Sequence, residues 1–256
     1  MKPNAALIKK EDILKINETA SYRTPNKETT MKFTFLKEQQ KSKLQLQSMS
    51  PKPQGKASLL SKFTDTRFNN TLKGFGVFTK AGCTSDKATK INQDIAFHSK
   101  NFLQIRNLYL FGVLDGHGDS GHILAKDIKK LLKQNMIGYE EENKKTKGRS
   151  LFLQGKEARK NLLIRTFEKT QIEVLSSNIS DPERSGSTAS LVLLFGKTLL
   201  CANVGDSRVI IASENKDKEW IATVLSKDHK PDDVEESTRI KAAGGKVDQY
   251  RGRNWI

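Results

Sequence analysis

A chain of 256 residues is long enough to bury a core without disulfides or structural metals. Its two cysteines, Cys83 and Cys201, lie far apart and form no CxxC pair, which fits a reducing compartment better than a secreted disulfide framework. No apolar run reaches the length of a membrane span, and the first residues show neither a secretory apolar region nor a glycine for myristoylation. We therefore expect an intracellular monomer, cytoplasmic, nuclear or both.

The formal net charge of +16 is concentrated in the first third of the chain. Residues 1–73 carry 15 Lys and Arg against 6 Asp and Glu, a net charge of +9. Such a segment could contact nucleic acid or an acidic membrane face, but it has no interleaved aromatic pattern and no zinc-ligand spacing. We interpret residues 1–73 as a basic, mostly disordered extension, and we do not expect nucleic-acid binding.

Apolar runs of strand length begin to alternate with turn signals at residue 74, so a folded domain is expected over residues 74–256. Residues 75–80 and 94–99 are predicted as short strands. Residues 107–114 are predicted as a buried strand that ends before Asp115-Gly-His-Gly118. An acidic residue is thus expected at the end of this strand.

Two helices are predicted after this strand. Asp119 and Ser120 are suitable N-caps, and apolar residues from Leu124 to Leu132 recur at helical spacing. The charged residues 141–150 are predicted as a loop, followed by a second helix that packs beside the first. One face of the second helix is expected to carry Leu163, Ile164, Phe167, Gln171, Val174 and Leu175.

The period changes to that of strands from Thr188 onward. Four strands are predicted, over residues 188–195, 198–204, 207–213 and 220–226, as an antiparallel meander. A last helix is predicted over residues 232–243, with Gly244-Gly245 as its stop. Helices grouped between strands indicate an α+β fold, with helices packed on antiparallel sheets, and argue against a doubly wound fold.

Three aspartates lie where a predicted strand meets a tight turn: Asp94, Asp115 and Asp206. Carboxylates that converge at strand ends make an oxygen-only site, which suits Mg²⁺ or Mn²⁺. A zinc site is not expected, because only four histidines are available and none has zinc-ligand spacing.

Each of these positions also has a purely structural interpretation. Asp115-Gly116 and Gly205-Asp206 could be ordinary turns, and Asp94 could be a strand-end cap. His117, taken alone, could be a hydrogen-bonded loop histidine with no part in proton transfer. The functional interpretation depends on the residues of all the motifs taken together and on their order along the chain.

Six segments of the chain resemble, in order, the motifs of the PPM-type (2C-type) metal-dependent protein serine/threonine phosphatases. The resemblance covers residues 74–256. The segments are Lys90-Ile-Asn-Gln-Asp94, Asp115-Gly-His-Gly118, Ser185-Gly-Ser-Thr-Ala189, Asn203-Val-Gly-Asp-Ser-Arg208, Leu225-Ser-Lys-Asp-His-Lys-Pro231 and Arg239-Ile-Lys-Ala-Ala-Gly-Gly245.

The resemblance implies a β-sandwich flanked by helices, and hydrolysis of phosphoserine and phosphothreonine in phosphoprotein substrates. Asp94, Asp115 and the Gly116 carbonyl would hold two Mg²⁺ or Mn²⁺ ions, and Asp206 matches the position associated with a third. The ions would activate a bridging water for attack on phosphorus.

Three other positions take their expected roles from the same resemblance. His117 would protonate the leaving oxygen of the serine or threonine. Lys90 would contact the substrate phosphate, with Lys87 as the alternative, although Lys90 could equally be a solvated loop lysine. Ser187, Thr188, Lys227 and Asp228 are expected to be framework or outer-shell residues.

The sequence departs from the family pattern in two places. Gln93 stands where many family members have Glu, although relatives with the Asn-Gln-Asp form exist. The family also continues beyond the Gly-Gly motif with strands and two acidic motifs for which residues 246–256 leave no room. We therefore expect the sandwich to lack its last strands, as in a truncated product or an incomplete gene model. The alternative function is that of an inactive or truncated phosphatase-like binding module.

Overall fold

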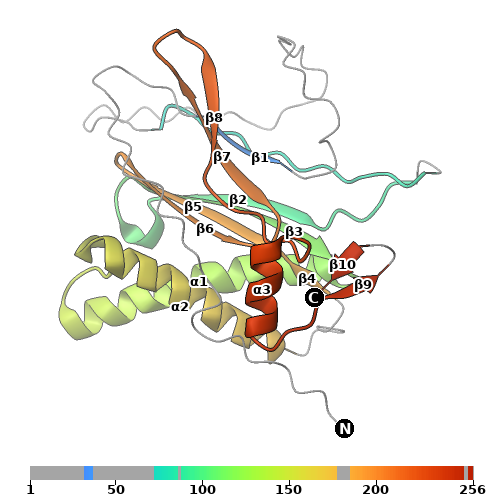
Figure 1. Ribbon diagram of the computed structural model, residues 1–256. Coiled ribbons are helices and arrows are strands. Elements are labelled where there is room, and N and C mark those ends of the chain that lie inside the picture. The colour runs from blue at the N-terminus through green and yellow to red at the C-terminus, as the bar shows by residue number, and fades with distance from the viewer. Residues whose placement is uncertain (1–31, 37–71, 86–87, 178–184, 251–252, 256) are drawn as a thin grey trace.

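The computed structural model describes residues 32–36, 72–85, 88–177, 185–250 and 253–255. Its elements form three layers (Figure 1). Two helices, α1 (Gly121–Lys147) and α2 (Lys156–Leu175), cover one face of a five-stranded antiparallel sheet. A three-stranded sheet lies on the other face. The α+β fold with antiparallel sheets and flanking helices is the one that the sequence predicted.

The larger sheet has the strand order β2 (Asp94–Lys100), β3 (Leu108–His117), β5 (Ala189–Phe195) and β6 (Thr198–Val204). The short β4 (Gly186–Ser187) extends the pairing of β3. β3 is longer than predicted, because β4 provides pairing partners for residues that the sequence suggested would form a turn. Both Gly116 and His117 are therefore in strand conformation.

The smaller sheet has the order β1 (Lys32–Leu36), β7 (Arg208–Glu214) and β8 (Trp220–Val224). The prediction of one continuous meander was therefore wrong, since the chain leaves the larger sheet after β6 and enters the smaller one at β7. Gly205, with φ of +92°, lies in the turn that makes this change. A left-handed backbone of this kind favours glycine.

Apolar side chains fill both interfaces of the larger sheet. On the helix side they come from α1, α2 and the strands, and Leu114 and Leu193 are fully buried there. On the other side, Val192 and Cys201 pack against Val209 of β7. Burial raises the pKa of the Cys201 thiol to about 12, as expected for a cysteine that serves as a small core residue.

α1 continues through most of the segment predicted to be a charged loop, and that prediction was wrong. The helix ends only at Gly148, whose φ of +65° forms the C-cap. The short helix η3 (Phe152–Gln154) then leads into α2. Glu and Lys are good helix formers, and the inward-facing Glu140 and Asn143 are buried, which anchors the last turns of α1 to the protein.

The inward face of α2 differs in part from the predicted one. Leu163, Phe167 and Val174 are buried as expected, but Gln171 and Leu175 are exposed. The buried face instead includes Thr166 and Thr170, whose short polar side chains gave no apolar signal. Thr166 satisfies its hydroxyl within the helix by donating to the Leu162 carbonyl at 2.7 Å.

The remaining described elements are η2 (Phe102–Gln104), α3 (Val234–Ala242), β9 (Asp248–Tyr250) and β10 (Arg253–Trp255). The Asp233 carboxylate caps α3 by accepting from the Glu236 amide at 3.0 Å. Among the described residues, no helix combines the length and the apolar character needed to cross a bilayer.

Residues 75–80 do not form the predicted strand. Phe75 packs on the His98 ring, with 4.1 Å between ring centroids, but Phe78 is 83% exposed and no strand of the described chain pairs with this segment. The predicted boundary at residue 74 stays a prediction. Before it lie β1 and the buried Leu72, which packs with Tyr109 and Leu194.

Candidate metal centre

The sequence motifs meet at one end of the larger sheet. Because neighbouring strands are antiparallel, the start of β2 and the start of β5 lie beside the ends of β3 and β6. The turn from β6 to β7 leaves from this end, and α3 and β4 lie there too (Figure 1). Segments that are far apart in the sequence therefore share one edge of the fold.

Asp94 and Asp115 are directly opposite each other across β2 and β3. Such a pair of residues has its side chains on the same face, with Cβ atoms about 4.5–5.5 Å apart. Both residues are partly exposed. The structure thus brings together the two aspartates that the sequence predicted as joint ligands, in an arrangement where two carboxylates repel unless a cation or proton lies between them.

Thr188 holds the backbone of Asp115 in place. Its hydroxyl accepts a hydrogen bond from the Asp115 amide at 3.0 Å, and its own amide donates to the Asp115 carbonyl at 3.0 Å. The same hydroxyl lies 2.7 Å from the hydroxyl of Ser207, in the turn between β6 and β7. Thr188, predicted only as a framework residue, therefore links Asp115 to the turn that carries Asp206.

Gly116 packs too closely for any side chain. A Cβ atom there would lie 2.5 Å from the Gly121 carbonyl oxygen at the start of α1 and 2.7 Å from the Gln93 carbonyl oxygen. The Gly116 amide donates to this Gln93 oxygen at 3.2 Å. The glycine is thus required because β3 lies directly against both the first turn of α1 and the entry to β2.

Gln93 has a role that its position in the motif did not reveal. Its side-chain amide donates to the Gly118 carbonyl at 2.6 Å, which ties the loop after β3 to the start of β2. A glutamate carboxylate has no proton to donate in this bond when ionised. The neutral amide is therefore used structurally, and a hydrogen-bond signal of this kind is not visible in a linear sequence.

His117 lies two residues after Asp115 on β3, so the two side chains are on the same face of the strand. His117 is exposed, and the residue paired with it on the neighbouring strand is Gly186 of β4. A Cβ atom at Gly186 would come within 2.8 Å of His117 Nε2. The absence of a side chain at Gly186 thus leaves room for the imidazole at the edge of the site.

Lys90 lies in an exposed hairpin that leads into β2. Its amide donates to the Gly82 carbonyl at 2.9 Å, and Cys83 and Thr89 form a bridge in the same hairpin. The backbone position of Lys90, four residues before Asp94, is therefore fixed, while its role toward phosphate stays a prediction. Lys87, the alternative, lies outside the described residues.

Asp206 lies half-buried in the turn between the two sheets. The preceding Gly205 donates its amide to His229 Nδ1 at 3.3 Å and accepts from the His229 amide at 3.0 Å. Asn203 donates to both the Gly205 and the Lys227 carbonyls at 3.1 Å. These bonds fix the turn against the segment after β8, although Asp206 itself stays a predicted ligand.

Arg208 and Asp228 form a bidentate pair next to this turn. The guanidinium donates from Nε to Asp228 Oδ1 at 2.8 Å and from Nη2 to Oδ2 at 2.5 Å. The hydrogen bond to Asp228 raises the pKa of Arg208 above its usual value. Asp228, predicted as an outer-shell residue, thus joins the start of β7 to the segment that leads to α3.

The donor atoms at this end of the sheet suit a hard divalent cation. Asp94 and Asp115 offer carboxylate oxygens and Gly116 a carbonyl oxygen, a set that Mg²⁺ or Mn²⁺ can complete with water. Within the described ranges, no three His, Cys, Asp or Glu side chains come together as a cation site. The paired carboxylates of Asp94 and Asp115 are therefore the main groups of the candidate metal centre.

The fold and the sequence have known relatives. The fold is similar to that of the crystal structure of serine-threonine phosphatase 2C from Toxoplasma gondii, with a TM-score of 0.51 and 20% identity, over 62% of this chain and 52% of the other. The family model described as "Protein phosphatase 2C" matches residues 81–255. The chain therefore belongs to the protein phosphatase 2C family.

Curated relatives from plants agree with this assignment. Probable protein phosphatase 2C 52 of Oryza sativa subsp. japonica is 33% identical over 171 residues, which cover 66% of this chain and 31% of the relative. Probable protein phosphatase 2C 41 of Arabidopsis thaliana is 30% identical over 203 residues, or 75% of this chain and 58% of the relative. The chain thus spans less than two thirds of the length of these relatives.

Proposed function

We propose that the protein is a metal-dependent phosphatase that hydrolyses phosphoserine and phosphothreonine in protein substrates. Membership of the protein phosphatase 2C family supports the reaction class. The observation that carries the proposal is the pairing of Asp94 with Asp115 across β2 and β3. Because backbone pairing holds the two carboxylates on one face of the larger sheet, both could bind the same cations.

Asp94, Asp115 and the Gly116 carbonyl would hold two Mg²⁺ or Mn²⁺ ions, and Asp206 would contribute to a third. Bound there, such ions would acidify a water and neutralise charge on the phosphoryl oxygens. The contribution of the protein is to keep these oxygens in place before the ions arrive. Thr188 does this for Asp115, since it bonds both the amide and the carbonyl of that residue.

His117 would protonate the leaving oxygen of the substrate. It shares a strand face with Asp115, it is exposed to an incoming substrate, and an imidazole can donate a proton near neutral pH. Lys90 would contribute a positive charge toward the phosphate from the hairpin before β2. Neither role needs a covalent phosphoenzyme, because the attacking group is water.

The test compares the wild-type chain with Asp94→Asn and Asp115→Asn, which keep the shape of the side chains but remove a charge. Hydrolysis of a phosphothreonine peptide with Mn²⁺ should fall about 100-fold or more in each variant, and chelator should stop the wild type. Asp119→Asn is the matched control, because Asp119 is exposed in the neighbouring loop. Undiminished turnover in excess chelator would rule out the mechanism.

A second function, that of a phosphatase-like module that binds phosphoproteins without turnover, is favoured by one observation. Within the described residues, no three His, Cys, Asp or Glu side chains come together as a group that could hold a metal ion. Titration calorimetry with Mn²⁺ separates the two functions. Two-site binding together with turnover supports the enzyme, whereas absent metal binding in a folded chain that still binds a phosphopeptide supports the module.

A further inference from the structure

The first half of α1 carries a group of four lysines: Lys126, Lys129, Lys130 and Lys133. At 3.6 residues per turn these positions fall within about 100° of the helix circumference. We call this group the α1 lysine stripe. Lys126 and Lys130 are exposed, while Lys129 and Lys133 are half-buried. The stripe lies away from the face of α1 that contacts the core, where Leu124 and Leu132 are buried.

The charge of the stripe is not compensated by neighbouring carboxylates. Its members stand three and four residues apart, a spacing at which like charges repel on a helix. No ion pair within the described part of the chain involves any of the four, and the only acidic residue between them is Asp127. Repulsion among these four lysines offsets part of their helix propensity, so packing against the sheet contributes to the stability of this part of α1.

The second half of the same helix is different. There, Glu140 pairs with Lys144 at 3.5 Å, and Glu141 and Glu142 balance the following lysines. The excess of positive charge is therefore confined to the half of α1 that begins at the candidate metal centre, where Gly121 packs on Gly116.

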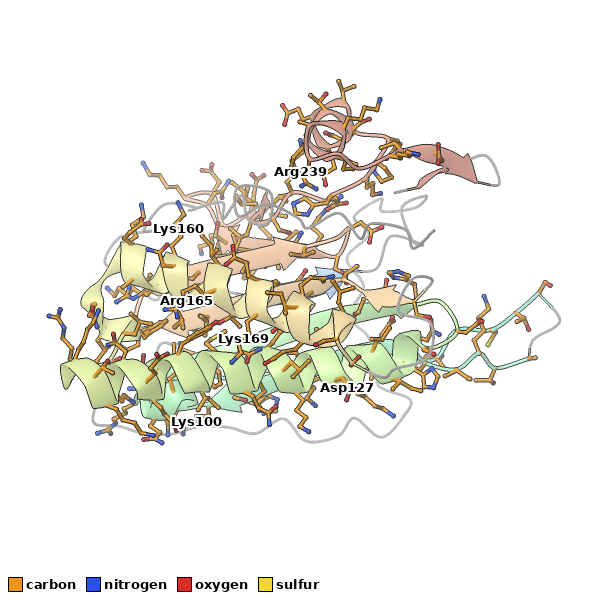
Figure 2. All side chains as sticks on the ribbon, turned by 90° about the horizontal axis from the view of Figure 1, so that it is seen from below. Lys100, Asp127, Lys160, Arg165, Lys169 and Arg239 are labelled. Atoms are coloured by element: carbon orange, nitrogen blue, oxygen red, sulfur yellow. The ribbon has the colours of Figure 1, made fainter. Side chains whose placement is uncertain are left out.

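The stripe follows the β2 side of the molecule. The Lys129 ammonium lies 5.7 Å from the centre of the Phe97 ring of β2, and β2 is the strand at this edge of the larger sheet. In Figure 2, Asp127 of α1 and Lys100 of β2 lie along the same lower side, whereas Arg165 and Lys169 of α2 lie on the other side of α1. Asp94 is the first residue of this edge strand, and its side chain lies on the sheet face away from α1, because it alternates with the helix-side Ile95. A peptide that reaches both the stripe and Asp94 must therefore pass around the β2 edge.

We propose that the α1 lysine stripe binds an acidic stretch of the phosphoprotein substrate while the phosphorylated residue occupies the candidate metal centre. This inference rests on the proposed function. With a rise of 1.5 Å per residue, the stripe covers about 8–18 Å of helix beyond Gly121. An extended peptide advances about 3.3 Å per residue, so this length alone corresponds to about two to six positions, and the path around β2 adds further residues before the acidic stretch. Because the helix that carries the stripe begins where Gly121 packs on Gly116, we assign the stripe to the peptide that carries the phosphorylated residue, and the test distinguishes this peptide from a nucleic acid and a membrane surface.

The test uses the full chain with Mn²⁺ and two pairs of fluorescent phosphothreonine peptides. In each pair, one peptide has Glu and the other Gln at four positions, on either the N-terminal or the C-terminal side. We expect kcat/KM to be up to about tenfold higher for one Glu peptide than for its Gln partner at low salt, and the difference to shrink as salt is added. The variant K126Q/K130Q/K133Q should lose this preference without change toward the Gln peptides or p-nitrophenyl phosphate.

The matched control removes the same charge from the other end of the helix, in K145Q/K147Q/R149Q, whose three side chains are exposed. This variant should keep the preference. The proposal is overturned if the wild type shows no preference for either Glu peptide, or if both variants behave alike. It is also overturned if the stripe lysines govern binding of single-stranded DNA or of phosphatidylserine vesicles but not of the Glu peptides.

Failure of the proposed function gives a different result. In that case no peptide is hydrolysed, and fluorescence anisotropy of the same peptides still reports whether the stripe binds the acidic ones. Tighter binding of a Glu peptide that disappears in K126Q/K130Q/K133Q supports the stripe even then. If all peptides are hydrolysed at equal rates, the proposed role of the α1 lysine stripe is rejected, while the proposed phosphatase function still stands.

Discussion

At the scale of single residues, the candidate metal centre depends on the hydroxyl of Thr188. It accepts from the Asp115 amide and lies 2.7 Å from Ser207, so one side chain orients both a predicted ligand and the turn next to Asp206. Groups that orient ligands typically change metal affinity by about 10–100-fold when they are removed. Thr188 is accordingly a positioning residue.

We predict that Thr188→Val lowers Mn²⁺ affinity about tenfold or more and the free energy of unfolding by about 1–3 kcal/mol, because the Asp115 amide loses its acceptor. Thr188→Ser keeps the hydroxyl and should restore most of the affinity. Calorimetry and urea unfolding measure the two quantities. If the valine and serine variants bind Mn²⁺ equally, the hydroxyl has no positioning role.

At the scale of residues, the sequence predicted that Asp94 and Asp115 lie together, and it predicted Thr188 as a framework residue, but it did not predict the contacts through which their supports act. Asp94 and Asp115 were expected to meet because each adjoined a predicted strand end, and the register of β2 and β3 places them opposite each other. The bond between Asp115 and Thr188 joins positions 73 residues apart, and the Gln93 bond to Gly118 depends on a loop conformation. Tertiary contacts of this kind leave no periodic signal.

At the scale of elements, the connection between α1 and α2 depends on one buried carboxylate. Glu140 is 1% exposed, and its Oε2 accepts from the Phe152 amide in η3 at 3.0 Å. The Lys144 ammonium lies 3.5 Å from the other carboxylate oxygen and also donates to the Leu103 carbonyl at 3.2 Å. Glu140 thus holds η3 at the start of the connection to α2, while its neighbour Lys144 makes the contact with η2.

We predict that Glu140→Ala lowers the free energy of unfolding by about 1–3 kcal/mol, since it leaves the Phe152 amide without its acceptor and opens a gap in the core. Glu141→Ala changes the adjacent exposed residue and should alter stability by less than about 0.5 kcal/mol. Denaturant unfolding of the two variants provides the comparison. Equal stability of both would mean that Glu140 is not needed for the connection.

The same contact explains why element boundaries were harder to predict than element types. Residues 141–150 have the composition of a solvated loop, but most of them continue α1 because Glu140 and Asn143 face inward. Residues 75–80 have the composition of a strand, yet no strand of the described chain pairs with them. In both segments the secondary structure depends on contacts with residues that are distant in the sequence, and the local sequence pattern does not contain this information.

At the scale of the whole molecule, the resemblance implied a β-sandwich and the structure has two sheets, but the sequence did not show that the chain changes sheets between β6 and β7. Short turns between strands such as β6 and β7 normally indicate a hairpin. Here the turn changes sheets, and it is fixed by contacts to residues more than 20 positions away, His229 and Lys227 among them. The overall class could still be predicted, because antiparallel strands grouped around two helices allow few arrangements.

The free energy of unfolding should depend on pH through His229, which bonds the turn between the two sheets. Burial lowers the pKa of His229 below its ordinary value, and the charges around the ring come from Glu236, Arg239, Lys227 and Asp228. The folded protein therefore takes up this proton less readily than the unfolded chain. Stability from this group is complete above about pH 6.5, the ordinary pKa, and is lost as the pH falls below it.

Protonation of His229 Nδ1 would also remove the acceptor for the Gly205 amide. We predict that the free energy of unfolding falls between pH 7.5 and pH 5.5, with this histidine contributing less than about 1.4 kcal/mol, the ceiling for one proton over one pH unit. His229→Asn should flatten the profile, since an amide can accept the same bond without titrating. The hydrogen bond to Arg239 lowers the pKa of Glu236, whose contribution is therefore lost only at still lower pH, outside this range. An unchanged slope in His229→Asn, measured by urea unfolding across the range, would show that another group causes the dependence.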